Sequence, residues 1–572
     1  MVAQSLIPSK RGIFSNGLRY PRRRSLAALG MRRLAPPPPI ALSPYRLIVH
    51  LVRSLLLPLA LATAAPLAAQ ARSRDWRPED RIVIGDFSRI TSIATSIDRV
   101  YATSTSAVLI WNPQFHQWQG PYDAPDPALL SRVFGALVDP LDNSLWLARP
   151  DGWIHFQPEL QLWDQGAVPD GVQGIAFDGN DPTPGLFLRT GRGWQLLPRG
   201  GLTPTPGRAP ARPVTPARVD DVLRSNPTLQ ANASQILVDP RLGVARFTAA
   251  ARSFDNLGWY LGTSGVGLLY LPDGAALPDR LPYGLRSPVV GAVFGAPDGI
   301  WAATSRTTQA EPAITFVDRE LKDFRSLQGP AAFGLPFAAV RKLVGQGTAL
   351  WAATDRGLAR IATGDGRVDF LDPGRGLPDA PVYSVASRQG RITAGTRRGL
   401  VRVNDSLRIE RVAPRFADAA LAVFPAGDSI WVGTQRGLLL ALPGGQDVVR
   451  PSTLASPSLQ APVVALGALG DTIVALTRDQ MLWRDPRTQA WTLGPNLSAL
   501  LGGLVAFVPD GPGFWVAGEQ GVGFARLGTP PVLPLKQGDL PGAANDLAVD
   551  SDFLWVATNG GLVRFRLDAV RP

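Results

Sequence analysis

Four arginines occupy the same place in four successive copies of a repeated phrase. They are Arg306 in TSRT, Arg356 in TDRG, Arg398 in TRRG and Arg436 in TQRG, each in a turn that follows a threonine. A guanidinium is a planar, permanently charged donor that suits carboxylate, sulfate and phosphate groups. The spacing therefore predicts an arc of ligand-binding arginines for an anionic glycan or polymer. The alternative is that exposed turns accept arginine and that acids such as Asp355 neutralise it.

Other groups that carry chemistry are scarce. The chain has three histidines, His50, His116 and His155, and no cysteine, which excludes a three-histidine metal site in the mature chain, a thiolate nucleophile and an iron–sulfur cluster. It also lacks the GxSxG, P-loop and GxGxxG motifs. Asp178, Asn180 and Asp181 could ligate calcium, although a turn explains them better. The composition predicts no enzyme, no metal and no cofactor.

The phrase that carries the arginines has its own pattern. It reads LWAATDRGLARI at 350–361, IWVGTQRGLLLA at 430–441 and LWVATNGGLVRF at 554–565. An apolar run with tryptophan, a polar turn with glycine and a second apolar run predict two antiparallel strands joined by a tight turn. The tryptophans supply large apolar area, so we expect them in the core rather than on a cofactor.

The tryptophan position recurs about every 40 residues. It falls at Tyr101, Trp146, Phe187, Tyr260, Trp301, Trp351, Thr393, Trp431, Val474, Trp515 and Trp555, which gives eleven units. Four short strands in about 40 residues are typical of propeller blades. The fold class is therefore all-β, a β-propeller of about eleven four-stranded blades. A β-solenoid is the alternative, but its coils are usually much shorter.

The units resemble a known family. The segment GLPDAPVYSVASRQGRITAGTRRGLVRV at 376–403 is similar to the two-component regulator propeller repeat, and so are the units from Trp301 onward. In that family such propellers commonly form the extracytoplasmic sensory part of hybrid regulators. The resemblance implies a propeller with a recognition role. This chain carries no kinase or regulator domain, so the resemblance does not settle a signalling role.

Eleven units exceed the four to eight blades usual in one propeller, which favours two rings. We expect N-terminal units over 72–284 and a seven-unit propeller over 285–572. The last unit stops after its third strand, whereas the strand at 81–87 precedes the first unit, so that strand could close the last blade. One propeller would then be inserted in the other, unless all units share one ring. A Pro-rich insertion near 198–243, with a helical stretch at 217–237, is expected to project as a recognition loop or a spacer.

The net charge of +12 comes mostly from the first 71 residues, which contain ten basic residues and no acidic ones. The rest is nearly neutral, which argues against a nucleic-acid partner. Residues 1–71 are predicted to be a leader with a secretory signal whose apolar region is 55–69 and whose cleavage site is near Arg72. A retained signal anchor is the alternative. With cleavage, we expect no membrane span and a periplasmic or secreted protein.

Together these features predict an exported, non-catalytic β-propeller that recognises a ligand or partner in the cell envelope. Its partner would be an unidentified envelope protein or an anionic glycan, and a sensory role in a signalling system is one form of this hypothesis. The alternatives are a structural scaffold subunit of an envelope complex, or a propeller enzyme such as a lyase or glycan hydrolase, which would need titratable groups that converge at a central pocket.

Overall fold

The repeated phrase forms the second and third strands of a blade. In the unit of Trp351, β25 (Ala349–Thr354) carries the tryptophan and β26 (Leu358–Ala362) carries the apolar run after the turn. The inner strand β24 (Val340–Gln346) and the outer strand β27 (Val368–Leu371) complete an antiparallel sheet. The six tryptophans of the phrase are core residues, as the sequence predicts: Trp146, Trp301, Trp351, Trp431, Trp515 and Trp555.

Glycine after the turn allows a close approach of the neighbouring strand. Gly437 and Gly561 have φ of 102° and 143°, in the region that disfavours other residues. At Gly357 a Cβ would lie 2.3 Å from the carbonyl oxygen of Leu371 on the outer strand. A side chain at this position would separate the third and fourth strands, so the glycine is required by packing.

The computed structural model describes residues 76–572 apart from residues 230, 232–234, 240–242, 309, 328–334, 452–459 and 530. These described residues belong to one compact unit, Ser73–Pro572. They form eleven antiparallel sheets, which confirms the predicted all-β propeller, although two of the sheets have five strands instead of four. The predicted signal region at 55–69, the cleavage position near Arg72 and His50 lie outside the described residues.

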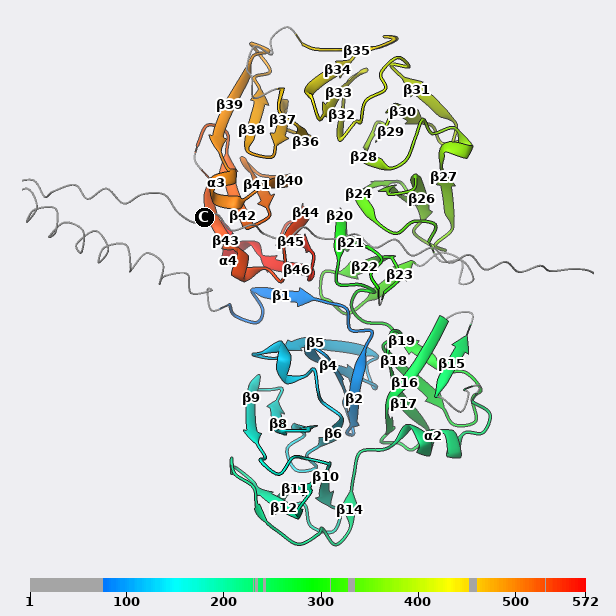
Figure 1. Ribbon diagram of the computed structural model, residues 1–572, viewed down its shortest axis with the longest axis vertical. Coiled ribbons are helices and arrows are strands. Elements are labelled where there is room, and N and C mark those ends of the chain that lie inside the picture. The colour runs from blue at the N-terminus through cyan, green and yellow to red at the C-terminus, as the bar shows by residue number, and fades with distance from the viewer. Residues whose placement is uncertain are drawn as a thin grey trace, which may run out of the picture. The chain divides into compact units, whose positions relative to one another are not determined.

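Seven sheets, here called the C-terminal ring, surround a common centre (Figure 1). Their innermost strands contact one another in a closed circuit, in the order β20, β24, β28, β32, β36, β40, β44 and β20 again. Besides β24–β27, the strands of the first four sheets are β20 (Val290–Ala296), β21 (Gly299–Thr304), β22 (Ala313–Asp318), β23 (Phe324–Leu327), β28 (Val382–Arg388), β29 (Arg391–Thr396), β30 (Gly399–Val403), β31 (Ile409–Val412), β32 (Ala422–Ala426), β33 (Ser429–Thr434), β34 (Gly437–Ala441) and β35 (Val448–Val449). The other three sheets contain β36 (Val463–Leu469), β37 (Thr472–Thr477), β38 (Gln480–Arg484), β39 (Trp491–Asn496), β40 (Leu504–Asp510), β41 (Gly513–Gly518), β42 (Gly521–Arg526), β43 (Val532–Lys536), β44 (Ala544–Val549), β45 (Phe553–Thr558) and β46 (Gly561–Arg566), with the short helices α3 (Ser498–Leu501) and α4 (Leu567–Val570).

The outer strand of the last sheet comes from the beginning of the chain. β1 (Arg81–Ile84) pairs antiparallel with β46, with Arg81 opposite Phe565 and Ile84 opposite Leu562. Ile84 is fully buried. Because β1 occupies the free edge of β46, the circuit of seven sheets contains strands from both ends of the described chain.

The remaining four sheets, here called the N-terminal ring, lie between β1 and β20 in the sequence. Their inner strands β2, β6, β10 and β16 contact in the order β16, β2, β6, β10. The strands are β2 (Ile90–Thr95), β3 (Val100–Ser104), β4 (Ala107–Asn112), β5 (Gln117–Asp123), β6 (Gly135–Val138), β7 (Leu145–Arg149), β8 (Gly152–Gln157), β9 (Leu162–Ala167), β10 (Gly174–Asp178), β11 (Gly185–Thr190), β12 (Gly193–Pro198), β13 (Thr205–Pro206), β14 (Pro213–Val214), β15 (Ile236–Asp239), β16 (Gly243–Arg252), β17 (Gly258–Thr263), β18 (Leu268–Pro272) and β19 (Asp279–Leu281).

The segment expected to project as a loop joins the N-terminal ring. β13 pairs with β12, and β14 pairs with β10. The helix α2 (Val219–Ser225) is much shorter than the expected 217–237, and it packs on β16 through Val219 and Val222 in a cluster with Phe247 and Ala250. The segment therefore lies between β10 and β16 and fills the fourth gap of the ring. The expectation of a projecting loop is wrong because proline-containing strands show no apolar alternation in the sequence.

The chain leaves and re-enters the C-terminal ring at neighbouring points. Asp86 and Leu285 form a parallel bridge, in which the backbone nitrogen of Leu285 donates to the carbonyl oxygen of Gly85 at 2.9 Å. Tyr283 lies beside this bridge, with ring centroids 5.0 Å from Trp118 and 4.4 Å from Phe324. Its hydroxyl donates to the carbonyl oxygen of Gly120 at 2.6 Å. The junction is thus a packed aromatic cluster.

Candidate functional site

The four predicted arginines lie in equivalent turns between the second and third strands of successive blades. Arg306 follows β21, Arg356 follows β25, Arg398 follows β29 and Arg436 follows β33. The preceding threonine fixes the turn in the last three units: its hydroxyl donates to a glycine carbonyl at 2.7 to 3.0 Å. All four arginines are exposed. They share one rim because their turns occupy the same position in consecutive blades.

Acidic neighbours already hold three of these guanidiniums. Arg306 pairs with Glu311 at 2.6 Å, Arg398 lies 3.4 Å from Asp379, and Arg436 pairs with Asp418. Within the described part of the chain, Arg356 has no ion pair. Exposed ion pairs are weak, so a strong anion could displace them. The arc remains a predicted site, with its charge partly neutralised.

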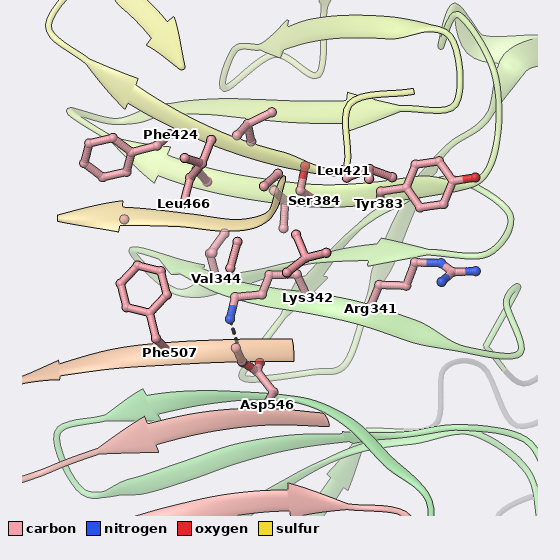
Figure 2. A pocket seen from close by; sticks show the side chains of 18 of the residues that line it. Arg341, Lys342, Val344, Tyr383, Ser384, Leu421, Phe424, Leu466, Phe507 and Asp546 are labelled. Atoms are coloured by element: carbon pink, nitrogen blue, oxygen red, sulfur yellow. Dashed lines mark hydrogen bonds and ion pairs between the residues drawn. The ribbon is translucent and has the colours of Figure 1, made fainter. Parts of the chain in front are cut away.

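A second candidate site is the channel at the centre of the C-terminal ring. Its cavity has a volume of about 350 Å³ and is lined by the inner strands from β24 to β44. This volume lies at the lower end of the range found for small-molecule pockets. Figure 2 shows its side chains.

The inner strands share a bulge at one end of this channel. In six of the seven, one residue is skipped in the pairing with the second strand, as between Val340 and Lys342, whereas β32 pairs with β33 without a shift. A bulge re-aims the skipped side chain and often occurs beside functional sites. The bulged residues are Gly291, Arg341, Tyr383, Val464, Val505 and Asn545, and Leu421 precedes β32 at the same place.

These seven residues give the mouth of the channel two unlike halves. Around the ring, Asn545, Gly291, Arg341 and Tyr383 are consecutive, followed by the apolar residues Leu421, Val464 and Val505. Arg341 is exposed, its guanidinium carbon lies 5.3 Å from the ring of Tyr383, and it has no ion pair among the described residues. The mouth therefore offers an uncompensated cation and a phenol opposite an apolar wall.

One ion pair crosses the lumen below the mouth. The ammonium group of Lys342 on β24 donates to Oδ1 of Asp546 on β44 at 2.7 Å, as the dashed line in Figure 2 marks. The side chain of Asp546 is only 3% exposed, whereas that of Lys342 is 40% exposed. Oδ2 of Asp546 also accepts from the backbone nitrogen of Val293 at 3.2 Å. Asp546 is thus held in place, while the ammonium group of Lys342 keeps hydrogens for another acceptor.

The far end of the channel is mostly apolar, with one cation, Arg388, whose guanidinium carbon lies 5.6 Å from the ring of Phe424. Val344, Phe424, Leu466 and Phe507 lie at the end opposite Arg341 and Tyr383 in Figure 2. The ring of Phe507 lies against Gly467 of the neighbouring inner strand, where a Cβ would be 2.9 Å from it. A ligand in this channel would meet Arg341 at one end and, at the other, hydrocarbon beside the guanidinium of Arg388, which donates to the carbonyl oxygen of Pro425.

Sequence reasoning missed the channel residues. Arg341, Tyr383, Lys342 and Asp546 lie on the inner strand of the blade, which has no tryptophan phrase to mark it. An alignment of the inner strands, VGAVF, VRKLV, VYSVA, VVALG, LVAFV and ANDLA, would have shown that polar residues occur at the second and third positions of only a few blades. The sequence therefore contains this pattern, but the bulge that turns these polar side chains toward the mouth of the channel is seen only in the structure.

His155 lies on β8 in a constellation that resembles a catalytic triad. Its Nε2 is 2.7 Å from the hydroxyl of Ser144, and its Nδ1 is 3.9 Å from Asp164. Ser144, however, is 2% exposed and donates to Asp142 at 2.5 Å, and the imidazole stacks on Trp146. Burial lowers the pKa of His155, which nearby carboxylates oppose. The group is therefore a buried hydrogen-bond network within the blade.

His116 and the acidic cluster occupy turns. His116 lies in the β4–β5 turn with φ of 51°. Asp178 accepts from the backbone nitrogens of Asn180, Ala211 and Arg212, and Asp181 accepts from Thr183. Throughout the described residues, no three His, Cys, Asp or Glu side chains are grouped so that they could hold a metal ion. In the same residues, no helix combines the length and apolarity needed to span a bilayer.

Comparisons with known proteins give structural likeness only. No family model and no curated protein matches the chain. Solved structures that resemble it include the extracellular domain of BT3049, assigned as a hybrid two-component system of B. thetaiotaomicron, at 13% identity and a TM-score of 0.40, with 84% of this chain and 68% of that one covered. The extracellular domain of BT4673 from the same organism gives 14% identity, a TM-score of 0.40 and coverage of 83% and 63%.

PorZ, a surface component of the type-IX secretion system of Porphyromonas gingivalis, gives 12% identity, a TM-score of 0.43 and coverage of 84% and 69%. The chain thus spans about two thirds of the length of these structures. Extracellular domains of two-component systems are the class that the repeats resemble in sequence. At these TM-scores the likeness carries no inference about ligand or partner, and the propeller itself rests on the strand pairing described above.

Proposed function

We propose that this protein is an exported, non-catalytic β-propeller of the cell envelope, periplasmic or secreted, that recognises an anionic glycan at the mouth of the C-terminal ring. One observation carries the proposal: the bulged inner strands present Arg341 and Tyr383 on one side of a channel whose other side is apolar. An acidic sugar combines a carboxylate with an apolar ring face, which suits both halves. The arc of Arg306, Arg356, Arg398 and Arg436 would extend the site along the same rim.

The arc and the mouth lie at the same end of the blades. Val340, at the start of the inner strand, is opposite Thr354, which ends β25 just before the turn of Arg356. The cations of both groups therefore face the same side of the ring. A polymer bound at Arg341 could continue across the turns, where it would compete with weak, exposed ion pairs.

Among the residues that line the channel, Asp546 supplies the one carboxylate, and Lys342 and Val293 hold it. Glycoside hydrolysis usually requires two carboxylates on either side of the scissile bond. This composition supports binding over hydrolysis. A lyase reaction would need a base beside the sugar, for which Tyr383 and Lys342 are the candidates, so the test includes a search for products.

The test is calorimetric titration of the protein with an oligogalacturonate and with a neutral oligosaccharide of the same length. We expect binding of the acidic oligomer alone, and about tenfold weaker binding by Arg341→Gln because one charge-assisted hydrogen bond is lost. Arg388→Gln is the matched control at the far end of the channel, where Arg388 donates to the carbonyl oxygen of Pro425. Equal affinity of R341Q and the unaltered protein would refute the mouth as the site.

The arc is tested separately. Combined replacement of Arg356, Arg398 and Arg436 by alanine should abolish retention on the acidic oligomer when it is immobilised as a polymer, whereas unchanged retention would remove the arc from the site. Release of shortened or unsaturated oligomers during either experiment would show that the protein is an enzyme.

A further inference from the structure

The N-terminal ring has an unusual set of turns at one end of its blades. In an antiparallel blade, the turn between the first and second strands and the turn between the third and fourth strands lie at the same end. The turns at this end comprise residues 96–99, 113–116, 139–144, 158–161, 179–184, 199–204, 253–257 and 273–278, here called the N-terminal turn face.

Large apolar side chains project from these turns. Seven of them are 56% to 72% exposed: Ile97, Phe115, Leu141, Leu160, Leu202, Phe254 and Leu257. None of the seven is required by packing inside the ring. Clusters of exposed apolar side chains on one surface usually mark an interaction site.

The corresponding turns of the C-terminal ring provide an internal comparison. They are built from residues such as Asp298, Gly347, Gly390, Gly427 and Gly470. Among the described residues of those turns, Leu442, at 44%, is the one large apolar side chain that is exposed. The apolar tips are therefore a property of the N-terminal ring and not of the blade itself.

Hydrogen bonds and ion pairs connect several of these turns into one surface. The amide of Asn143 donates to Asp98 at 3.1 Å, which joins the turns of Leu141 and Ile97. Arg99 pairs with Glu159, which joins the turn of Ile97 to that of Leu160. The apolar tips of neighbouring blades are thus held beside one another.

The N-terminal turn face is also acidic. Its turns carry seven carboxylates, Asp98, Asp139, Asp142, Glu159, Asp181, Asp255 and Asp273, and two arginines, Arg99 and Arg199. Both arginines are consumed in ion pairs, Arg99 with Glu159 and Arg199 with Asp139. Arg252, at the end of β16, pairs with Asp273. Asp142, Asp181 and Asp255 form no ion pair among the described residues, although hydroxyl groups donate to each of them. The face therefore combines apolar tips with excess negative charge.

We propose that the N-terminal turn face docks a segment of a partner protein that presents apolar and basic side chains together. The apolar tips would supply the buried contact, and the unpaired carboxylates would select lysine and arginine at its rim. A second copy of this chain is a poor occupant because it would bring the same negative charge to the contact. An anionic lipid surface is disfavoured for the same reason.

The test measures binding of two synthetic 18-residue amphipathic peptides to the full chain, one of leucine and lysine and the other of leucine and glutamate. We expect the lysine peptide to bind at least tenfold more tightly than the glutamate peptide, and less tightly as salt is raised. The triple variant I97S/L141S/F254S should lose at least tenfold of this affinity. Because these side chains are exposed, the variant is expected to fold normally, which its melting temperature checks.

The matched control is L442S/L493S/L500S, which removes three exposed leucines of the C-terminal ring, each 44% to 47% exposed, and should leave binding unchanged. The proposal is overturned if the two peptides bind equally, if the triple variant binds as the unaltered protein does, or if the tips instead mediate self-association. Sedimentation of the protein alone reports self-association. The proposal is also overturned, in favour of a membrane surface, if the unaltered protein binds neutral phosphatidylcholine vesicles and the triple variant does not.

Discussion

The two rings are built from the same blade, but they close in different ways. In the C-terminal ring every inner strand contacts its two neighbours, and β1 supplies the missing strand of the last sheet. In the N-terminal ring three gaps are closed by neighbouring inner strands, while the fourth holds the segment that contains β14 and α2. Seven blades can meet edge to edge around a channel. Four blades leave a gap that this chain fills with a short helix.

The two rings also differ in the kind of surface that we propose as a binding site. The C-terminal ring keeps an open channel, whose mouth bears Arg341 and Tyr383. In the N-terminal ring, residues 216–220 lie beside the inner strands β2, β6 and β16 and line with them a smaller cavity of about 270 Å³. Its exposed chemistry lies instead in the turns. The ring that closes on itself therefore offers a channel with a charged mouth, whereas the ring whose fourth gap is filled offers a face of exposed turns.

The largest effect is expected when the closing strand of the C-terminal ring is broken. Ile84→Asp places a carboxylate at a fully buried position of β1. Since a buried unpaired charge cannot be accommodated, β1 should detach and the free energy of unfolding should fall by about 4 kcal/mol. Chemical denaturation measures the loss, and hydrogen exchange at Leu562 and Arg564, whose backbone nitrogens face β1, should accelerate because β46 becomes an edge.

Ile97→Asp is the matched control, since Ile97 is 59% exposed in a turn of the other ring. It should change stability by less than about 0.5 kcal/mol. If both variants lose the same stability, closure by β1 is not what holds the C-terminal ring together.

A smaller effect is expected from the helix that fills the gap of the N-terminal ring. Val222 is fully buried on α2, and Val222→Ala should cost about 2 kcal/mol through lost apolar contact. Faster hydrogen exchange should appear in β16 and leave β46 unaffected. Val238→Ala, at a position 66% exposed, serves as the control. An equal loss of hydrogen-exchange protection in both rings would show that they unfold as one unit. The different ways in which the two rings close would then make no difference to their stability.

The smallest effect concerns pH and again distinguishes the rings, because His155 lies in the N-terminal one. Burial lowers its pKa in the folded protein, so below about 6.5 the unfolded chain takes up a proton that the folded chain resists. Stability should therefore decrease as pH falls from 7.5 to 5.5. His155→Gln should remove this part of the slope, as compared by denaturation midpoints at the two pH values; an identical slope in the variant would mean that other groups cause it.

The sequence predicted what is local. The phrase around Trp351 or Trp555 contains two strands and their turn, so it identified the blades, and its tryptophans are core residues as expected. β13 and β14 were missed because two-residue strands that contain proline have no periodicity. The sequence also predicts a helix over 217–237, which is too long, because α2 ends at Ser225 and β15 begins at Ile236.

The candidate site was predictable only in part. The recurrence of arginine after threonine marked one rim, but it did not reveal Asp379 and Asp418, which come from other turns and pair with Arg398 and Arg436. The contact of Lys342 with Asp546 joins residues 204 positions apart, and no local pattern predicts it. The direction of the side chains at the mouth of the channel depends on a bulge. The bulge is an inner-strand residue left unpaired by the second strand, so it is defined only by the pairing of two strands.

The bridge between Asp86 and Leu285 has an architectural consequence. The backbone nitrogen of Leu285 donates to the carbonyl oxygen of Gly85 at 2.9 Å, so the chain enters and leaves the N-terminal ring at adjacent points of the C-terminal ring. The N-terminal ring is thus an inserted domain. It could be exchanged for another domain, or replaced by a few residues, without a change in the strand connections of the seven blades. A lineage that carried this scaffold could thus change what one ring recognises while it conserved the other.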